Sequence, residues 1–206
     1  MIVTDIIFLD KKRDKVYIDD EFAFVLYKGE LHLYSIEVGQ ELTPDKYHKI
    51  TQEVLVKRAK LRAINLLTKK DYTEKGLRKK LAEGYYDEKQ INSAIDYLKS
   101  YGYLDDIRYV KNYFSVYISS QPKNKIIRKL LEKGIDKELI ESLIEEIYEE
   151  EKELSNLPDE MEMGRKLLAK KKYDLCANAK DRQKAFGYLL RNGIEKEKAV
   201  ILLKEY

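Results

Sequence analysis

The sequence predicts a mainly α-helical fold: an elongated, curved array of three tandem three-helix repeats, preceded by a small antiparallel β-meander. Two observations carry this prediction, a glycine-ended motif that occurs three times and a strand-like alternation confined to the N-terminal segment. The composition agrees, because three Pro and nine Gly in 206 residues, with a mean hydropathy of −0.57, are typical of a helix-rich chain. We expect the meander at 1–42, the first repeat with its lead-in helix at 43–104, and the other repeats at 105–157 and 158–206.

The N-terminal segment alternates apolar with polar residues, as half-buried strands do. The alternating apolar positions are Ile2, Ile6, Phe8, Val16, Ile18, Phe22, Phe24, Leu26, Leu31 and Leu33. Charged or glycine-containing stretches interrupt them, and tight turns are expected there. His32 is therefore expected in a strand. The meander ends at Thr43 and Pro44, since Thr is a good N-cap and Pro suits the first helical position.

One motif recurs three times: an apolar residue, three residues, Leu, two residues, Gly and a further apolar residue. Its copies occupy 77–85, 127–135 and 186–194. Each copy predicts a helix that ends at a glycine with positive φ, namely Gly84, Gly134 or Gly193. Gly134→Val is therefore expected to destabilise the protein more than Gly164→Ala, because Gly164 falls inside a predicted helix, where Ala is favoured.

Each motif lies between two further predicted helices. The helix that follows shows apolar residues at i, i+3, i+4 and i+7, beginning at Ile91, Ile140 and Ala199. Pro122 separates the first two helices of the middle repeat, and Pro158 lies at the junction of the last two repeats. A repeat of about 50 residues buries little core alone, so neighbouring repeats are expected to stack.

Basic residues gather in three zones, although the net charge of the whole chain is only +3. Residues 57–80 hold ten Lys or Arg against two acids, 123–129 hold four without an acid, and 164–191 hold nine against two. The intervening 132–162 hold thirteen acids against three bases. This alternation favours a surface that binds a polyanion. The alternative is that each charged run is only a solvated helix face.

No motif for catalysis or for a structural metal occurs, so neither an enzyme nor a cofactor is expected. Cys176, His32 and His48 are too few for a zinc site. Cys176 is expected to be an inert thiol, and the histidines are expected at the surface or an interface. Asp105 and Asp106 would point about 100° apart on a helix, so one of them is expected to be an N-cap and not half of a catalytic pair.

The longest uncharged stretch, 113–121, is far too short to span a bilayer. The N-terminus lacks the basic region and small-residue cleavage site of a secretory signal. The sequence therefore predicts a cytoplasmic protein that does not associate with membranes.

The most distinctive stretch is Gly-Tyr-Leu-Asp-Asp at 102–106. Together with 77–85, 91–98, Tyr109, Tyr113 and 131–140, it resembles the RecX family of bacterial RecA regulators. The resemblance covers about 59–206, and its order of three tandem three-helix repeats agrees with the family fold. Two departures are Val110, where the family usually has alanine, and about eight additional residues at 174–181.

The resemblance implies a non-enzymatic regulator that binds in the groove of the RecA–DNA filament and inhibits recombinase, ATPase and coprotease activity, with single- or double-stranded DNA as a further contact. Basic patches at repeating positions suit this role, because separate contacts along a filament add in avidity. We expect a monomer. From charge alone, the expected partner-binding residues are Lys57, Arg58, Arg62, Lys69, Lys70, Arg78, Lys79, Lys123, Lys125, Arg128, Lys129, Lys170, Lys171, Lys172, Arg182 and Arg191.

Two other functions fit the same pattern. The first is a direct DNA-binding protein of tandem helix-turn-helix type, which needs Asn, Gln or Arg at the start of a recognition helix. The acids at 87–88 and at 136 and 138 disfavour it. The second is a protein-binding scaffold, whose binding would depend much less steeply on salt than phosphate binding does.

Overall fold

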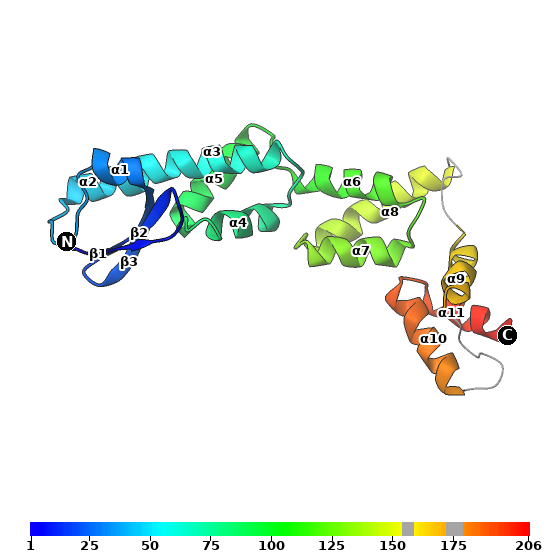
Figure 1. Ribbon diagram of the computed structural model, residues 1–206. Coiled ribbons are helices and arrows are strands. Elements are labelled where there is room, and N and C mark those ends of the chain that lie inside the picture. The colour runs from blue at the N-terminus through cyan, green and yellow to red at the C-terminus, as the bar shows by residue number, and fades with distance from the viewer. Residues whose placement is uncertain (154–158, 172–178) are drawn as a thin grey trace. The chain divides into compact units, whose positions relative to one another are not determined.

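The computed structural model describes residues 1–153, 159–171 and 179–206 (Figure 1). They form two compact units, Met1–Leu104 and Asp105–Tyr206. The chain is mainly helical with one small antiparallel sheet at the N-terminus, as the sequence predicts. Pro158, Lys172 and Cys176 lie outside the described residues. Within the described ranges, no helix combines the length and the apolar character that crossing a membrane requires.

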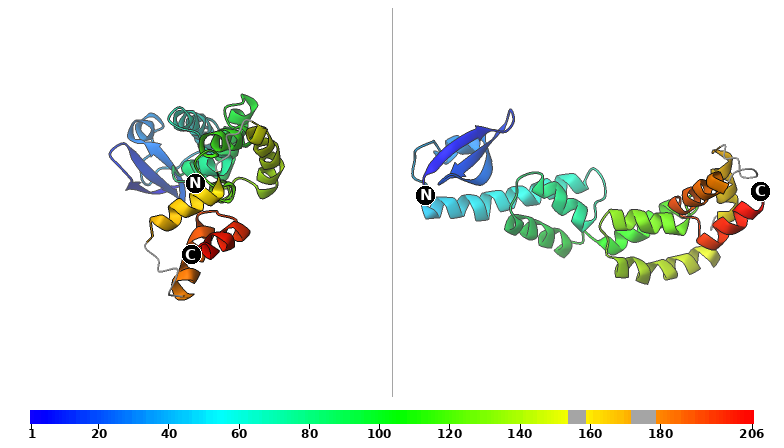
Figure 2. Two further views of the ribbon diagram at one scale, coloured as in Figure 1. Left: turned by 90° about the vertical axis from the view of Figure 1, so that its right-hand side faces the viewer. Right: turned by 90° about the horizontal axis from the view of Figure 1, so that it is seen from below.

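The sheet of the first unit is a meander of three strands paired in chain order. They are β1 (Val3–Phe8), β2 (Arg13–Ile18) and β3 (Glu21–Tyr27). The predicted alternation places Val16, Ile18 and Phe24 in the core. The buried face packs against Ile50 and Leu55, which belong to the helical run that follows (Figure 2).

The prediction of a strand at Leu31 and Leu33 is wrong, because Lys28–Leu33 forms a short helix, α1. The carboxylate of Glu30 accepts a hydrogen bond from the backbone N–H of Tyr27 at 2.8 Å, which stabilises the first turn. Leu33 is 72% exposed, so it takes no part in the core that its alternation with Leu31 suggested. His32 therefore lies on this helix, exposed, and not in a strand.

A continuous helical run leads from the sheet into the first repeat. It consists of α2 (Pro44–His48), the π-helical segment η1 (Lys49–Val54) and α3 (Leu55–Leu67). Thr43 is the N-cap, as predicted: its Oγ1 accepts a hydrogen bond from the backbone N–H of Lys46 at 3.4 Å. Pro44 occupies the first helical position, where its missing N–H costs nothing.

The first three-helix repeat consists of α3, α4 (Glu74–Ala82) and α5 (Glu88–Ser100) (Figure 1). Its core contains Ala59, Ala63, Leu66, Leu77, Leu81, Ile91, Ala94, Ile95, Leu98 and Leu104. The three alanines lie on α3 and α5, and such small side chains let two helix backbones approach closely. Thr73 and Asp87 cap α4 and α5, so local sequence fixes where each helix begins.

The second unit contains two further sets of three helices, each with its own core. The first set is α6 (Asp106–Tyr117), α7 (Lys123–Glu132) and α8 (Lys137–Glu153), and the second is α9 (Glu160–Ala169), α10 (Ala179–Arg191) and α11 (Lys196–Lys204). Asp105 is the N-cap of α6, as predicted, and accepts hydrogen bonds from Ile107 N at 2.9 Å and Arg108 N at 3.1 Å. Pro122 stands immediately before α7, also as predicted.

The glycine that ends each motif has the predicted positive φ in two of three copies. Gly134 has φ 84° and Gly193 has φ 92°. In the first copy the prediction is wrong, because Tyr85 and not Gly84 adopts the left-handed conformation, with φ 66°. In the other two copies, the residue after the glycine donates its N–H to the end of the helix. Here Tyr86, one residue further along, donates its N–H to Leu81 O, so the chain leaves α4 one residue later than expected.

Two contacts explain why a tyrosine is tolerated there. The ring of Tyr85 packs on Phe22 with 6.1 Å between centroids, and the ammonium of Lys15 lies 4.7 Å from its centroid. Gly84 is instead needed for space, because a Cβ there would lie 3.0 Å from Leu81 O and 3.1 Å from the ring of Tyr86. The sheet thus contributes to the conformation at the end of α4.

The structure shows a steric cost of Gly164→Ala that helix propensity does not include. Gly164 is buried where α9 meets α11, and a Cβ there would lie 2.2 Å from Cδ1 of Leu202. Leu202 is fully buried, so its side chain has little room to move away. Helix propensity favours Ala at this position, but close packing between the helices opposes it.

Candidate nucleic-acid interface

The predicted contact residues form two groups: those whose charged side chains already bind other groups of the protein, and those whose side chains are exposed. Arg58 on α3 is the clearest case of internal use, with a side chain that is only 15% exposed. Its Nη1 lies 2.6 Å from Glu30 Oε2, its Nη2 donates to Val25 O at 2.5 Å, and its guanidinium lies 4.9 Å from the centroid of the Tyr27 ring. Arg58 therefore joins α3 to the sheet and to α1, and we leave it out of the candidate interface.

Arg58→Gln is expected to lower the free energy of unfolding by about 1–3 kcal/mol, because the half-buried Glu30 and the Val25 carbonyl lose their donors. Lys57→Gln, a change at the neighbouring exposed position, is the matched control and should cost less than about 0.5 kcal/mol. Urea denaturation followed by circular dichroism measures both. Equal shifts for the two variants would show that Arg58 does not hold the sheet in place.

Arg78 on α4 is also engaged. It donates to Glu74 at 2.8 Å and to Asn92 at 2.6 Å, and Lys99 also pairs with Glu74. Burial raises the pKa of Glu74, but the hydrogen bonds from Lys99 and Arg78 outweigh it and hold that pKa below its usual value. Arg78 thus ties α4 to α5, and its charge is largely neutralised where it lies.

On α7, two predicted contacts have internal partners. Arg128 donates to the backbone carbonyls of Arg191 at 2.8 Å and Leu190 at 3.3 Å, at the end of α10. Lys129 pairs with Glu132 at 2.7 Å. At the end of α10 the Leu190 carbonyl also accepts a hydrogen bond from Gly193 N at 3.0 Å, so Arg128 adds a second donor to it. The Arg128 contacts join the two helical sets of the second unit.

The remaining predicted residues are better placed to bind an anionic partner. In the part of the chain that the structure describes, no acidic side chain pairs with Lys57, Arg62, Lys69, Lys79, Lys125, Lys170 or Arg191. Three further ammonium groups lie over tyrosine rings, namely those of Lys70 over Tyr72, Lys123 over Tyr148 and Lys171 over Tyr188. Arg182 is exposed on α10 and also has contacts within the protein. Cations placed over rings keep their charge and remain able to attract anions.

Two exposed lysine pairs occupy corresponding places in different repeats. Lys69 and Lys70 follow the end of α3, and Lys170 and Lys171 follow the end of α9. Each pair therefore lies at the turn between the first and second helices of its repeat. This recurrence is not required by either core, because all four side chains are exposed.

The fold brings two predicted residues together in the second unit. Lys125 of α7 and Lys170 line a cavity of about 320 Å³, which Lys166 of α9 also lines. The other lining residues are Ser119, Ser120, Pro122, Met163, Leu167 and Asn192. Lys166 pairs with Glu162 at 2.7 Å, but none of the described residues that line the cavity is acidic. The cavity therefore combines positive charge with serine hydroxyls, a set of donors that suits an anion.

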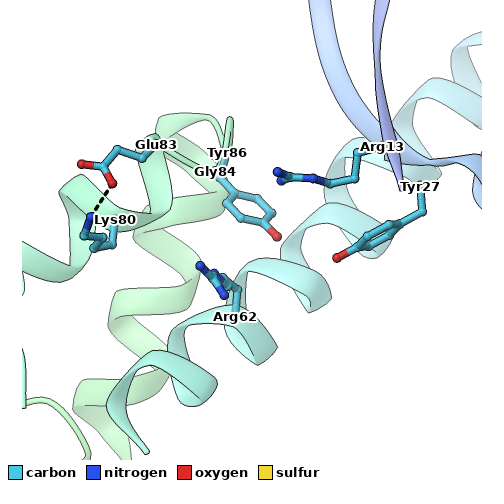
Figure 3. A pocket seen from close by; sticks show the side chains of 7 residues that line it. All are labelled: Arg13, Tyr27, Arg62, Lys80, Glu83, Gly84 and Tyr86. Atoms are coloured by element: carbon cyan, nitrogen blue, oxygen red, sulfur yellow. Dashed lines mark hydrogen bonds and ion pairs between the residues drawn. The ribbon is translucent and has the colours of Figure 1, made fainter. Parts of the chain in front are cut away.

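A second basic cavity lies in the first unit and contains Arg62, together with residues that sequence reasoning missed (Figure 3). The most important of these are Arg13, from the sheet, and Lys80 of α4. Lys80 belongs to the basic zone at 57–80, so the sequence could have suggested it as a contact residue. Arg13 has no such signal, because a charged residue beside a predicted turn needs no other explanation.

The helix starts that a base-reading protein would use are occupied by caps. Asp87 accepts a hydrogen bond from Gln90 N at 2.7 Å, and Asp136 accepts from the backbone at the start of α8. The side chain of Gln90 is buried and donates to Thr51 O at 3.3 Å. These residues therefore do not present donors to base edges. Within the described residues, no group of His, Cys, Asp and Glu side chains is placed to hold a metal ion.

Comparison with known proteins finds similarity in the helical part of this chain. The family model described as RecX, first three-helix domain, matches residues 59–98, which comprise most of α3, α4 and α5. The regulatory protein RecX of Clostridium acetobutylicum is 35% identical over 118 residues, covering 56% of this chain and 55% of that protein. The regulatory protein RecX of Caldanaerobacter subterraneus subsp. tengcongensis is 35% identical over 112 residues, covering 54% and 57%. The matches thus span about half the length of these relatives.

Solved structures share the fold. A crystal structure of regulatory protein RecX aligns with a TM-score of 0.59 at 20% identity, covering 100% of this chain and 99% of that one. The crystal structure of RecX from Lactobacillus salivarius aligns with a TM-score of 0.55 at 19% identity, covering 74% and 96%. At such identities the likeness concerns the fold alone. The family model, the related sequences and the repeated three-helix architecture agree with one another, and together they support a RecX family protein.

Proposed function

We propose that this protein regulates the RecA recombinase by binding the RecA–DNA filament, and that binding inhibits recombination, ATP hydrolysis and coprotease activity. The observation that carries the proposal is the recurrence of exposed basic residues at the same turn of the first and third repeats, Lys69–Lys70 and Lys170–Lys171. The similarity to RecX regulatory proteins supports it.

A filament offers many copies of each binding surface. Several weak basic contacts on one chain then combine into strong binding, because each contact made raises the effective concentration of the next. Phosphate contacts release counterions, so such binding weakens steeply with salt. No single site needs to be strong, which fits a surface whose cations are spread over three repeats.

The proposal is tested by adding the protein to RecA from the same cell and measuring DNA-dependent ATP hydrolysis. We expect inhibition at concentrations below that of RecA, and a plot of log affinity against log salt with a slope of about −3 or steeper, as expected for about four phosphate contacts. No change in ATP hydrolysis at a saturating concentration would reject the proposal.

The same titration separates the two other functions. A protein-binding scaffold would inhibit with little dependence on salt. A direct DNA-binding protein would bind naked duplex as tightly as the filament, which the acidic caps of α5 and α8 disfavour.

A further inference from the structure

The sheet and the first repeat enclose a cavity of about 320 Å³ between them (Figure 3). Its lining residues are Arg13, Tyr27, Arg62, Lys80, Glu83, Gly84 and Tyr86. Arg13 and Tyr27 come from β2 and β3, Arg62 comes from α3, and the others come from α4 and the turn after it. The cavity therefore exists only because the sheet packs beside the first repeat.

Its lining is positive on balance. Three basic side chains face one acid, Glu83, which is already held by Lys80 at 2.6 Å. The Glu83 partner raises the pKa of Lys80, whereas nearby Arg62 acts in the opposite direction. Arg62 itself has no acidic partner in the described part of the chain. An anion placed between these cations would relieve their repulsion.

Arg13 keeps part of its guanidinium free for a ligand. Asp10 accepts a hydrogen bond from its Nε at 2.9 Å and lies 2.8 Å from its Nη2, which leaves Nη1 outside that ion pair. Figure 3 shows the guanidinium groups of Arg13 and Arg62 pointing toward the ring of Tyr86 from two sides. Asp10 thus orients Arg13 while one of its nitrogens remains able to donate.

Two phenol groups complete the lining. Burial raises the pKa of Tyr86, although Arg58 and Arg13 oppose this effect, so its hydroxyl stays protonated at neutral pH and can donate. Tyr27 lies on the opposite side of the same cavity (Figure 3). Gly84 leaves room for the Tyr86 ring, since a Cβ at this position would lie 3.1 Å from that ring.

We propose that this cavity is a binding site for a phosphate group, with Arg13, Arg62 and Lys80 as its cationic contacts and Tyr27 and Tyr86 as further donors. The two oxygens of a carboxylate lie in one plane, whereas the four oxygens of a phosphate group point in tetrahedral directions and can meet donors that come from three sides. The site gives the N-terminal sheet a role in ligand binding. It goes beyond the proposed action on RecA, because it concerns one discrete cavity and requires no recombinase.

The test uses the full chain and NMR titration of the Tyr27 and Tyr86 ring signals, assigned with Tyr27→Phe and Tyr86→Phe. The probes are thymidine 5′-monophosphate, inorganic phosphate and, as a control, thymidine. We expect saturable shifts with both phosphate-bearing probes and none with thymidine. Absence of shifts at millimolar phosphate probes would overturn the proposal.

Arg62→Gln should weaken binding of thymidine 5′-monophosphate about tenfold or more, because the variant has no charge to assist its hydrogen bond to the phosphate. Lys75→Gln removes an exposed charge of α4 outside the cavity, and should change the affinity less than twofold. Arg62 makes no ion pair in the described structure, so its removal should leave the melting temperature unchanged. Equal affinities for the two variants would overturn the assignment.

The source of the phosphate is separated with a short oligothymidylate with or without a 5′-phosphate. Tighter binding of the phosphorylated strand assigns the cavity to a strand end, and equal binding of both assigns it to internal phosphodiesters. Binding of the mononucleotide alone assigns it to a free nucleotide. An acidic peptide that shifts the same tyrosine signals at lower concentration than any phosphate probe would show a carboxylate site and overturn the proposal.

Discussion

Gly193→Ala is expected to lower the free energy of unfolding of the second unit by about 2–4 kcal/mol. Two effects add. Gly193 has φ 92°, which costs a residue with a side chain about 1 kcal/mol. A Cβ there would also lie 2.6 Å from Lys125 N and 2.7 Å from Lys125 Cβ, and overpacking of this kind costs about 1–3 kcal/mol.

The crowding matters because the neighbour is backbone, which has no rotamer to change. To make room, α7 has to move away from the end of α10, and this movement would lengthen the hydrogen bonds from Arg128 to the carbonyls of Leu190 and Arg191. Urea denaturation measures the loss of stability, and hydrogen exchange in α7 and α10 shows where it falls.

Gly39→Ala is the matched control. Gly39 has nearly the same φ, 86°, but nothing lies within 4 Å of a Cβ built there. It should therefore cost only the conformational part, about 1 kcal/mol. If both variants lower the free energy of unfolding by the same amount, the close approach between Gly193 and Lys125 adds nothing to the cost of the substitution.

Reversing exposed lysines of the first unit should abolish inhibition of RecA without unfolding the protein. The sequence suggests Lys69, Lys70, Arg78 and Lys79, but Arg78 already pairs with Glu74. We therefore replace it with Lys57 and expect Lys57, Lys69, Lys70 and Lys79, all changed to Glu, to weaken filament binding about tenfold or more. The salt slope should become shallower by about one unit for each phosphate group that the variant no longer binds.

Folding should change little, because an exposed ion pair contributes only about 0–1 kcal/mol. The matched control reverses four acids of α8, namely Glu138, Glu141, Glu145 and Glu149, to Lys, and should keep or strengthen binding. Melting temperature and ATP hydrolysis are measured on both variants. Inhibition by the lysine variant at wild-type concentration and salt sensitivity would place the binding surface elsewhere, on apolar edges or on the sheet.

The sequence by itself determined those features that depend on neighbouring residues. Helix starts at Thr43 and Asp105 follow from side chains that accept a nearby N–H, and the three-helix repeat follows from apolar spacing. The positive φ of Gly134 and Gly193 follows likewise from a local motif. In each case the deciding interaction joins residues only a few positions apart, so the sequence alone is enough to predict it.

The candidate site could be predicted only in part. The basic zones identify the exposed lysines at the ends of α3 and α9, because exposure is the usual state of Lys. Charge alone did not show that Arg58 and Arg128 bind other segments of the protein. Their partners lie 33 and 63 residues away, respectively.

Only the tertiary structure decided the remaining features. Segment 28–33 is helical, with Glu30 held by Arg58 of α3, and Tyr85 replaces glycine in the left-handed conformation beside Phe22 and Lys15 of the sheet. The cavity lined by Arg13, Arg62 and Lys80 likewise forms only when β2, β3, α3 and α4 come together. The physical reason is the same throughout: contacts between segments far apart in the chain can outweigh local preferences by a few kcal/mol, and no pattern within one segment records which distant segment it meets.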